Sequence, residues 1–214
     1  MNPRESASHL WAVVPVKPLR RAKSRLARAL KADQRAALAR SVFARTIDVL
    51  ASVDRIEQTL VVSSDLTVHD IARSKGALAL AESEPGLNVA LSQACALAAS
   101  RAASGVLIVP TDLPLLTAHD VESLIDLACE PACLVIAPDR RGEGTNALLL
   151  RPPHIIRPAF GPSSFEAHQA RATVASLPAH VYRSPTLALD IDRPSDLERY
   201  QELARVLDAP PLYE

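Results

Sequence analysis

The sequence predicts a three-layer α/β fold, in which helices cover both faces of a mostly parallel mixed sheet. Two observations predict it. Short apolar, Val-rich segments alternate with amphipathic segments along all 214 residues, and no linker or shift in composition divides the chain. Hydrophobic residues make up 48% of the chain, which is enough for a sizeable core, and the net charge of zero argues against disorder. We therefore expect one domain over residues 1–214.

The first half of the chain alternates strand and helix. The apolar run Leu10–Val16 predicts a buried first strand. Apolar residues recur at helical spacing over Gln34–Leu50 and predict an amphipathic helix. The other elements expected here are strands over Thr59–Ser63 and Ala77–Ala81, a helix over Leu66–Lys75 that Gly76 stops, and a helix over Asn88–Ala103 that Asn88 caps.

The second half continues the alternation. Val106–Pro110 is fully apolar and predicts a buried strand, and Thr117 and Asp120 have the spacing of a capping pair at the start of a helix over Thr117–Cys129. The remaining expected elements are strands over Cys133–Ala137, Ala147–Leu150 and Leu187–Ile191, a Pro-rich loop over 152–162, a helix over Ser163–Ser176, and a last helix that Pro194 opens.

The composition excludes several classes of protein. No apolar run approaches the 18 residues of a membrane span, and the N-terminus lacks a signal-peptide pattern. The three cysteines have neither the spacing of a zinc site nor that of a disulfide framework. Aromatic residues make up only 3%, which disfavours proteins that bind nucleic acid by base stacking. A cytoplasmic protein is expected.

The charge is unevenly distributed. Residues 1–50 hold eleven Lys or Arg against three acids, and the stretch 17–31 holds seven basic residues and no acid. Such a patch attracts polyanions, either a nucleic acid or the triphosphate of a nucleotide. A solvated basic helix face is the alternative interpretation.

Residues directly after the strands are the first candidates for a binding site, because ligands of open α/β sheets bind beyond the carboxyl ends of the strands. Lys17 follows the first strand, and Lys23 and Arg25 come close behind it. Together these cations can hold phosphate oxygens. The glycine-rich signatures of P-loop and dinucleotide-binding proteins are absent.

Acids follow two other predicted strands. Asp112 comes directly after the fourth strand, and Asp190 and Asp192 lie at the end of the last one. In a strand, residues i and i+2 face the same side about 6.6 Å apart, so their carboxylates repel unless a cation lies between them. Mg²⁺ prefers such oxygen ligands. The alternatives are a turn cap for Asp112 and a helix cap for Asp192. Three acids beside a basic loop predict a metal–triphosphate site.

Two polar segments could hold a second substrate. Gly144–Asn146 precedes a strand, and residues 160–165 precede a helix whose first N–H groups can bind an anion. A plain turn with a serine cap is the alternative. His168 lies one turn into that helix but is not assigned a role, because satisfied histidines are commoner than working ones.

Seven motifs, taken in order, resemble the 2-phospho-L-lactate / phosphoenolpyruvate guanylyltransferase family, which acts in coenzyme F-420 biosynthesis. They are VPVKPLRRAKSRLA, SSD, EPGLNVAL, VPTDLPLL, APDRRGEGTNALLL, FGPSSFEAH and LDIDRPSDL. The resemblance runs from about Trp11 to Leu197. The resemblance implies a nucleotidyltransferase of glycosyltransferase-A-like fold. The first loop departs from the glycine-rich loop of that wider group.

The resemblance also implies roles for individual residues. The divalent metal, Mg²⁺, would be held by Asp112, Asp190 and Asp192. GTP would be held by Lys17, Lys23, Arg25 and Asn88, with Lys17, Lys23 and Asp112 catalytic. The phosphorylated acceptor acid would be held by Thr145, Gly161 and Ser164. The expected partners are GTP and a small phospho-acid, with a homodimer left open and no nucleic-acid or membrane partner.

The implied reaction transfers GMP from GTP to the phosphate of phosphoenolpyruvate, 2-phospho-L-lactate or 3-phospho-D-glycerate and releases pyrophosphate. The acceptor phosphate is already largely dianionic at neutral pH, so no general base is needed. Leu91 and Cys95 share one helix face, and we expect them either to shape the acceptor pocket or to pack in the core. The competing functions are a nucleotidyltransferase with a molybdopterin or sugar-phosphate acceptor, a nucleic-acid-binding module, and a scaffold with a degenerate site.

Overall fold

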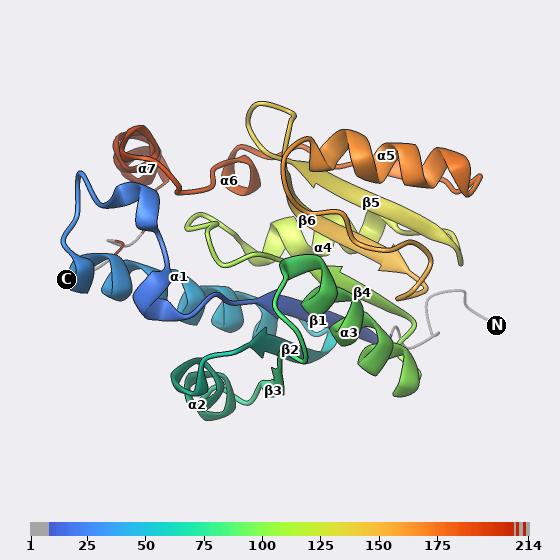
Figure 1. Cartoon of the computed structure of the whole chain (residues 1–214). Coiled ribbons are helices and arrows are strands. Elements are labelled where there is room, and N and C mark those ends of the chain that lie inside the picture. Colours follow the sequence, from blue (N-terminus) through green and yellow to red (C-terminus); the bar gives the residue numbers. More distant parts are fainter. Residues whose placement is uncertain (1–8, 208, 210–211, 213–214) are drawn as a thin grey trace.

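The computed structural model describes residues 9–207, 209 and 212, and its centre is a sheet of seven strands (Figure 1). The strands lie in the order β3-β2-β1-β4-β6-β5-β7. Their bounds are β1 Leu10–Pro15, β2 Ile56–Ser63, β3 Leu78–Ala81, β4 Gly105–Ile108, β5 Cys133–Pro138, β6 Thr145–Arg151 and β7 Ala179–Val181.

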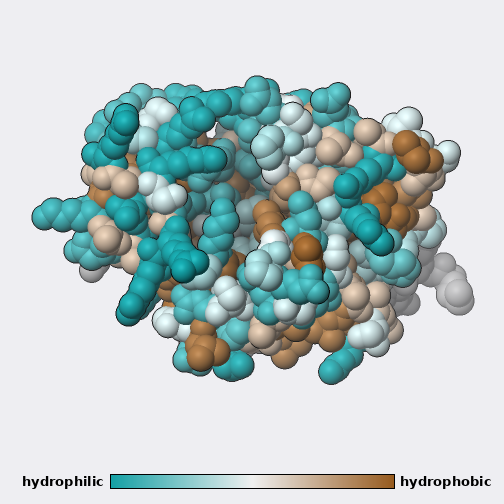
Figure 2. Space-filling model, viewed as in Figure 1, coloured by the Kyte–Doolittle hydropathy of each residue, from teal (hydrophilic) through white to brown (hydrophobic). Residues whose placement is uncertain are grey.

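One strand of this sheet runs against the others. β1 pairs in parallel with β2 and β4, β2 with β3, and β5 with β7, whereas β6 is antiparallel to both β4 and β5. The carboxyl ends of the other strands therefore share one edge with the amino end of β6. In Figure 2, which has the same view as Figure 1, the molecule is hollowed near its centre, and hydrophilic side chains gather to the left of the hollow.

Helices cover both faces of the sheet and give the three layers that the sequence predicts. Their bounds are α1 Ala32–Ala51, α2 Leu66–Ser74, α3 Leu87–Ser100, α4 Ala118–Leu127, α5 Ser164–Val174, α6 Pro185–Ala188 and α7 Pro194–Leu207, with two short 3₁₀ turns, η1 Leu19–Arg21 and η2 Ser24–Leu26, after β1. None of these described helices is long and apolar enough to cross a membrane.

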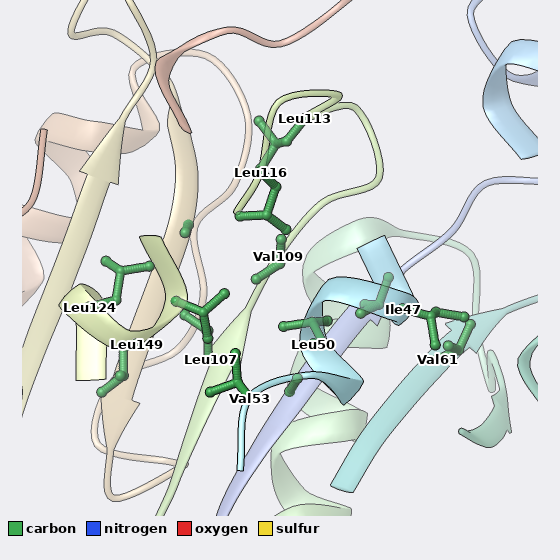
Figure 3. Close-up of a cluster of buried hydrophobic side chains, with 14 of the residues drawn as sticks. Ile47, Leu50, Val53, Val61, Leu107, Val109, Leu113, Leu116, Leu124 and Leu149 are labelled. Atoms are coloured by element: carbon green, nitrogen blue, oxygen red, sulfur yellow. The ribbon is translucent and has the colours of Figure 1, made fainter. Parts of the chain in front are cut away.

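The two faces of each strand build two separate cores, because successive side chains alternate across the sheet. Ala12 and Val14 of β1 belong to the core under α1, α2 and α4, whereas Trp11 and Val13 belong to the core under α3 and α5. Figure 3 shows the first core, where side chains of α1, β2, β4, α4 and β6 meet. A third cluster, around Leu26 and Tyr200, packs α7 against the start of α1.

The structure confirms the capping pair predicted at the start of α4. The Thr117 side chain accepts from the Asp120 backbone N–H, and the Asp120 carboxylate accepts from the Thr117 backbone, which is a full capping box. The expected cap at Asn88 is wrong, since α3 begins at Leu87 and its N-cap is Gly86, whose φ of +136° suits glycine.

The predicted last strand over Leu187–Ile191 is also wrong. Pro185–Ala188 forms the short helix α6, which Ser184 caps, and the residues that follow are irregular. The position beside β5 is taken by β7, a strand that the sequence analysis missed. Leu187, Leu189 and Ile191 are apolar because they are buried in clusters beside the sheet.

Candidate active site

A cavity of about 780 Å³ opens at the edge where the strands' carboxyl ends meet the amino end of β6. Segments far apart in the sequence line it together. They are the loop after β1 (residues 15–25), the start of α3, Pro110–Asp112 after β4, the β5–β6 turn with the start of β6 (139–146), residues 160–164 before α5, and parts of 190–196.

The basic loop after β1 forms one wall of the cavity. Lys17, Lys23 and Arg25, the three cations predicted to hold phosphate, all line it. Lys23 lies between the two 3₁₀ turns with a left-handed backbone, φ +53°, a conformation that is uncommon outside glycine. The Asp65 carboxylate accepts the Leu19 backbone N–H at 3.1 Å and so fastens this loop to the end of β2.

Asp112 faces this loop from the end of β4. Its Oδ2 lies 4.0 Å from the Nζ of Lys23, whose side chain is only 8% exposed. Burial raises the pKa of the Asp112 carboxyl, and the nearby charge of Lys23 partly offsets that rise. Lys23 and the partly exposed Asp112 carboxylate are therefore charge partners in this structure.

Asp190 reaches the same cavity from the segment after α6. The Ile191 backbone N–H donates to the Asp112 carbonyl at 2.9 Å, which joins the two acid-bearing segments. Burial, followed by the charges of Asp112 and Asp192, raises the pKa of Asp190 to about 6. Negative charge is therefore crowded here, and a cation would relieve the repulsion.

Asp192 is turned toward the basic loop. Its carboxylate accepts from Arg25 at 2.8 Å, while Asp196 makes the capping interaction with the backbone N–H groups of Asp192 and Arg193. The carboxylates of Asp112, Asp190 and Asp192 do not form a set within 4.8 Å; among the described residues only Cys129, Glu130 and His180 do so, outside this cavity.

The carboxylates fit Mg²⁺ by their chemistry, because they offer only oxygen and the repulsion at Asp190 calls for positive charge. Asp112 and Asp190 are already joined through their backbones. To bind the ion, the Asp192 carboxylate would have to give up its ion pair with Arg25. The predicted set of three ligands stays a prediction.

The turn between β5 and β6 brings residues to the cavity that the sequence analysis did not assign. Arg140 and Arg141 line it, and Arg140 lies 3.8 Å from Asp196. The Asp139 carboxylate accepts the backbone N–H groups of Arg141 and Glu143 and fixes the turn. This turn directly follows β5, just as Lys17 and Asp112 follow predicted strands. The same sequence signal, a position directly after a strand, therefore indicates this turn as well.

The acceptor-side residues predicted from the sequence also lie at this cavity. Thr145, Gly161 and Ser164 all line the cavity, although β6 and α5 carry them separately. Gly161 has φ +140°, which suits glycine.

The expected free N–H groups at the start of α5 are partly used. Ser164 N–H donates to Gly161 and Phe165 N–H donates to Glu143. The Ser164 hydroxyl has no hydrogen bond to another described residue, so it can still bind a ligand.

Asn88, Leu91 and Cys95 of α3 do not line the cavity. The Asn88 amide makes two hydrogen bonds with the backbone of Phe160, accepting its N–H at 2.8 Å and donating to its carbonyl at 2.9 Å. Both polar atoms are used, so Asn88 fixes the loop before α5 in this structure, and its role in nucleotide binding stays a prediction. Leu91 and Cys95 are buried in the core under α3, which is the second of the two placements expected for them.

The fold and this cavity define a class of protein. The same fold occurs in 4-diphosphocytidyl-2C-methyl-D-erythritol synthase from Anaerococcus prevotii, with a TM-score of 0.66 at 9% identity over 96% of this chain and 100% of that one. It also occurs in CMP:2-keto-3-deoxy-manno-octonic acid synthetase complexed with CTP, with a TM-score of 0.62 at 12% identity over 92% and 99% of the two chains. These structures show the class of fold to which the chain belongs, the glycosyltransferase-A-like fold of nucleotidyltransferases.

The family is narrower than this class. The model of the family "Guanylyl transferase CofC like" matches residues 10–201. Phosphoenolpyruvate guanylyltransferase of Sphaerobacter thermophilus is 42% identical over 187 residues, 87% of this chain and 90% of that protein. The enzyme of the same name from Rubrobacter xylanophilus is 41% identical over 192 residues, 90% of this chain and 93% of that protein. The chain belongs to the CofC-like guanylyl transferase family.

Proposed function

We propose that this guanylyltransferase transfers GMP from GTP to the phosphate of phosphoenolpyruvate, releases pyrophosphate, and acts in coenzyme F-420 biosynthesis. One observation carries the proposal. A single cavity is lined by phosphate-binding cations, by crowded carboxylates and by a hydroxyl-bearing wall, which are the parts needed to bring two anions together. Phosphoenolpyruvate is the acceptor of choice because it is named for the two relatives above 40% identity.

The reaction needs charge neutralisation and alignment. A phosphate oxygen of phosphoenolpyruvate forms a bond to the α-phosphorus of GTP, and the bond from that phosphorus to the β-phosphate oxygen breaks. The product is a phosphoanhydride between GMP and enolpyruvyl phosphate. No proton has to move, because the attacking phosphate is already largely dianionic. Orientation and electrostatic stabilisation then supply the catalysis.

The basic loop provides positive charge on the nucleotide side. Lys17, Lys23 and Arg25 would hold the triphosphate and stabilise the charge that leaves with pyrophosphate. In this structure Lys23 pairs with Asp112 and Arg25 with Asp192, and on nucleotide binding phosphate would take the place of these carboxylates. The acids are then left for a cation.

Asp112 and Asp190, joined by Asp192, would hold Mg²⁺ on this face of the cavity. When bound, Mg²⁺ supplies a Lewis acid that neutralises phosphate oxygens and aligns them. The residues themselves supply oxygen ligands and a partly buried environment in which charge interactions are stronger than in water.

Thr145, Gly161 and Ser164 would hold the acceptor. Their hydroxyl and backbone groups suit the carboxylate and phosphate of a small phospho-acid, and the cavity confines them with the basic loop.

The test is pyrophosphate release by the purified protein with Mg²⁺ and GTP. Phosphoenolpyruvate, 2-phospho-L-lactate and 3-phospho-D-glycerate are supplied one at a time, with ATP and CTP in place of GTP as controls. We expect release with GTP and phosphoenolpyruvate, a product with the mass of the mixed anhydride, and no release after chelation of Mg²⁺. Faster release with another acid, or no release with any acid, would overturn the assignment of the acceptor.

A further inference from the structure

We propose that His168 is a positioning residue that makes the Thr145 hydroxyl an obligatory donor to the anionic acceptor. The proposal rests on the proposed function, in which Thr145 binds phosphoenolpyruvate. His168 itself does not line the cavity and is fully buried within α5. Its imidazole lies between the amino end of β6 and the loop before α5, the two segments that carry the acceptor-side residues.

The hydrogen bonds of His168 determine its tautomer. The Ala159 backbone N–H donates to Nε2 at 2.9 Å, and a backbone N–H can only donate. Nε2 is therefore the unprotonated nitrogen, and in a neutral ring Nδ1 carries the proton. Nδ1 lies 3.0 Å from the Thr145 Oγ1, so Nδ1–H donates to that oxygen.

This bond fixes the polarity of the Thr145 hydroxyl. A hydroxyl has one proton to donate. The Thr145 hydroxyl oxygen accepts a hydrogen bond from His168, so its own proton is not used in that bond. No other described residue bonds the Thr145 Oγ1, and Thr145 lines the cavity while being only 7% exposed. Its O–H is thus left for a ligand in the cavity. A carboxylate or phosphate can only accept, so an anion is the ligand that matches this proton.

The surroundings of His168 keep it neutral. Burial lowers its pKa to about 4, and the positive charge of Arg171 acts in the same direction. A second proton on Nε2 would also oppose the Ala159 N–H. Phe160 packs edge-on against the ring, with the ring centroids 5.2 Å apart, and the Asn88 amide holds the Phe160 backbone by two hydrogen bonds. The ring therefore has one orientation and one tautomer, and it is unsuited to act as a general base.

The experiment is a double-mutant cycle with steady-state kinetics. His168→Gln places an amide oxygen near the position of Nε2, so it retains an acceptor for Ala159 but loses the donor to Thr145. Thr145→Val removes the hydroxyl at nearly constant shape. A matched control is Thr46→Val, because Thr46 is equally buried but bonds the Val42 carbonyl within α1, away from the cavity.

We expect Thr145→Val to raise the KM for phosphoenolpyruvate roughly tenfold or more, the effect of losing a hydrogen bond to a charged group. The KM for GTP should stay within about twofold of wild type. His168→Gln should raise the same KM about fivefold, and in the Thr145→Val background it should add nothing. Thr46→Val should leave both KM values unchanged.

The outcomes separate two failures. An unchanged KM in Thr145→Val overturns the acceptor-side assignment and this inference with it. A raised KM in Thr145→Val, together with a His168→Gln effect that persists in full without the hydroxyl, overturns the positioning role alone.

A measurement on the wild-type protein keeps the inference testable if a variant fails to fold. Long-range ¹⁵N–¹H spectra of histidine-labelled protein report which ring nitrogen carries the proton. We expect His168 as the Nδ1–H tautomer at pH 7.5, with a shift on addition of phosphoenolpyruvate. The Nε2–H tautomer, or a ring that titrates near pH 6.5, would refute the argument.

Discussion

The stability of this enzyme at mildly acid pH should depend on His168. The ring is buried with both nitrogens hydrogen-bonded, and its pKa is lowered to about 4 from an ordinary 6.5. Between these two values the unfolded chain binds a proton at this position and the folded chain does not. Folding stability from this group is therefore complete above pH 6.5 and is lost as the pH falls toward 4.

The magnitude follows from the two pKa values. At pH 5 the unfolded histidine is almost fully protonated and the folded one is about one-tenth protonated, which corresponds to about 2 kcal/mol of lost stability relative to pH 7.5. Asp190 acts in the opposite direction, because burial raises its pKa to about 6 and the folded state binds its proton more readily. A comparison of two proteins that share Asp190 is therefore needed.

The assay is urea unfolding of wild type and His168→Gln, each at pH 7.5 and pH 5, without metal or nucleotide. Glutamine does not titrate, so the wild type should lose about 2 kcal/mol more than the variant between the two pH values. Equal losses in the two proteins would refute the reasoning, because they would mean that His168 titrates alike in the folded and unfolded states.

Three further predictions concern the cavity and the core beneath it. Asp112→Asn and Asp190→Asn should each lower kcat roughly 100-fold or more. Their circular dichroism spectra and melting temperatures should stay close to wild type, and near-normal turnover would refute the metal-binding role. Gly161→Ala should cost about 1–3 kcal/mol of stability in urea unfolding and raise the KM for phosphoenolpyruvate, because its φ of +140° strains any other residue although the space is open; an unchanged KM would contradict its place in the acceptor wall. Leu91→Ala should lower the free energy of unfolding by about 2–5 kcal/mol in the same assay, because Leu91 packs in the core. The ratio of rates with different phospho-acids should stay unchanged, and an altered ratio would support a role for Leu91 in the acceptor pocket.

Local patterns in the sequence were enough for most of the fold. The Val-rich β1 and β4, the capping box of α4 and the helical spacing of α1 all act over a few residues, so they can be read without knowledge of the rest of the chain. The same holds for Lys17 and Asp112, because residues that follow the parallel strands of such a sheet lie at the edge where ligands bind.

The sequence-based predictions were wrong where contacts with residues distant in the sequence determine the local structure. Leu187–Ile191 has the apolar composition of a strand, but β7 already occupies the sheet edge and this segment is buried beside it. Asn88 has the residue type and position of a cap, yet its amide is taken by the backbone of Phe160, 72 residues away. Neither competition is visible in a window of ten residues.

The sequence by itself determined the class of fold, the family and most of the charged groups of the site, because these follow from local pattern and ordered motifs. Only the tertiary structure decided how the groups face one another. The reversal of β6 brings Thr145, at the beginning of a strand, to the edge where the other strands end. The Asp192 carboxylate pairs with Arg25, and the Ala159 N–H fixes the proton of His168. Hydrogen bonds and charges act through space over a few ångströms, and the sequence does not state which distant residues come that close.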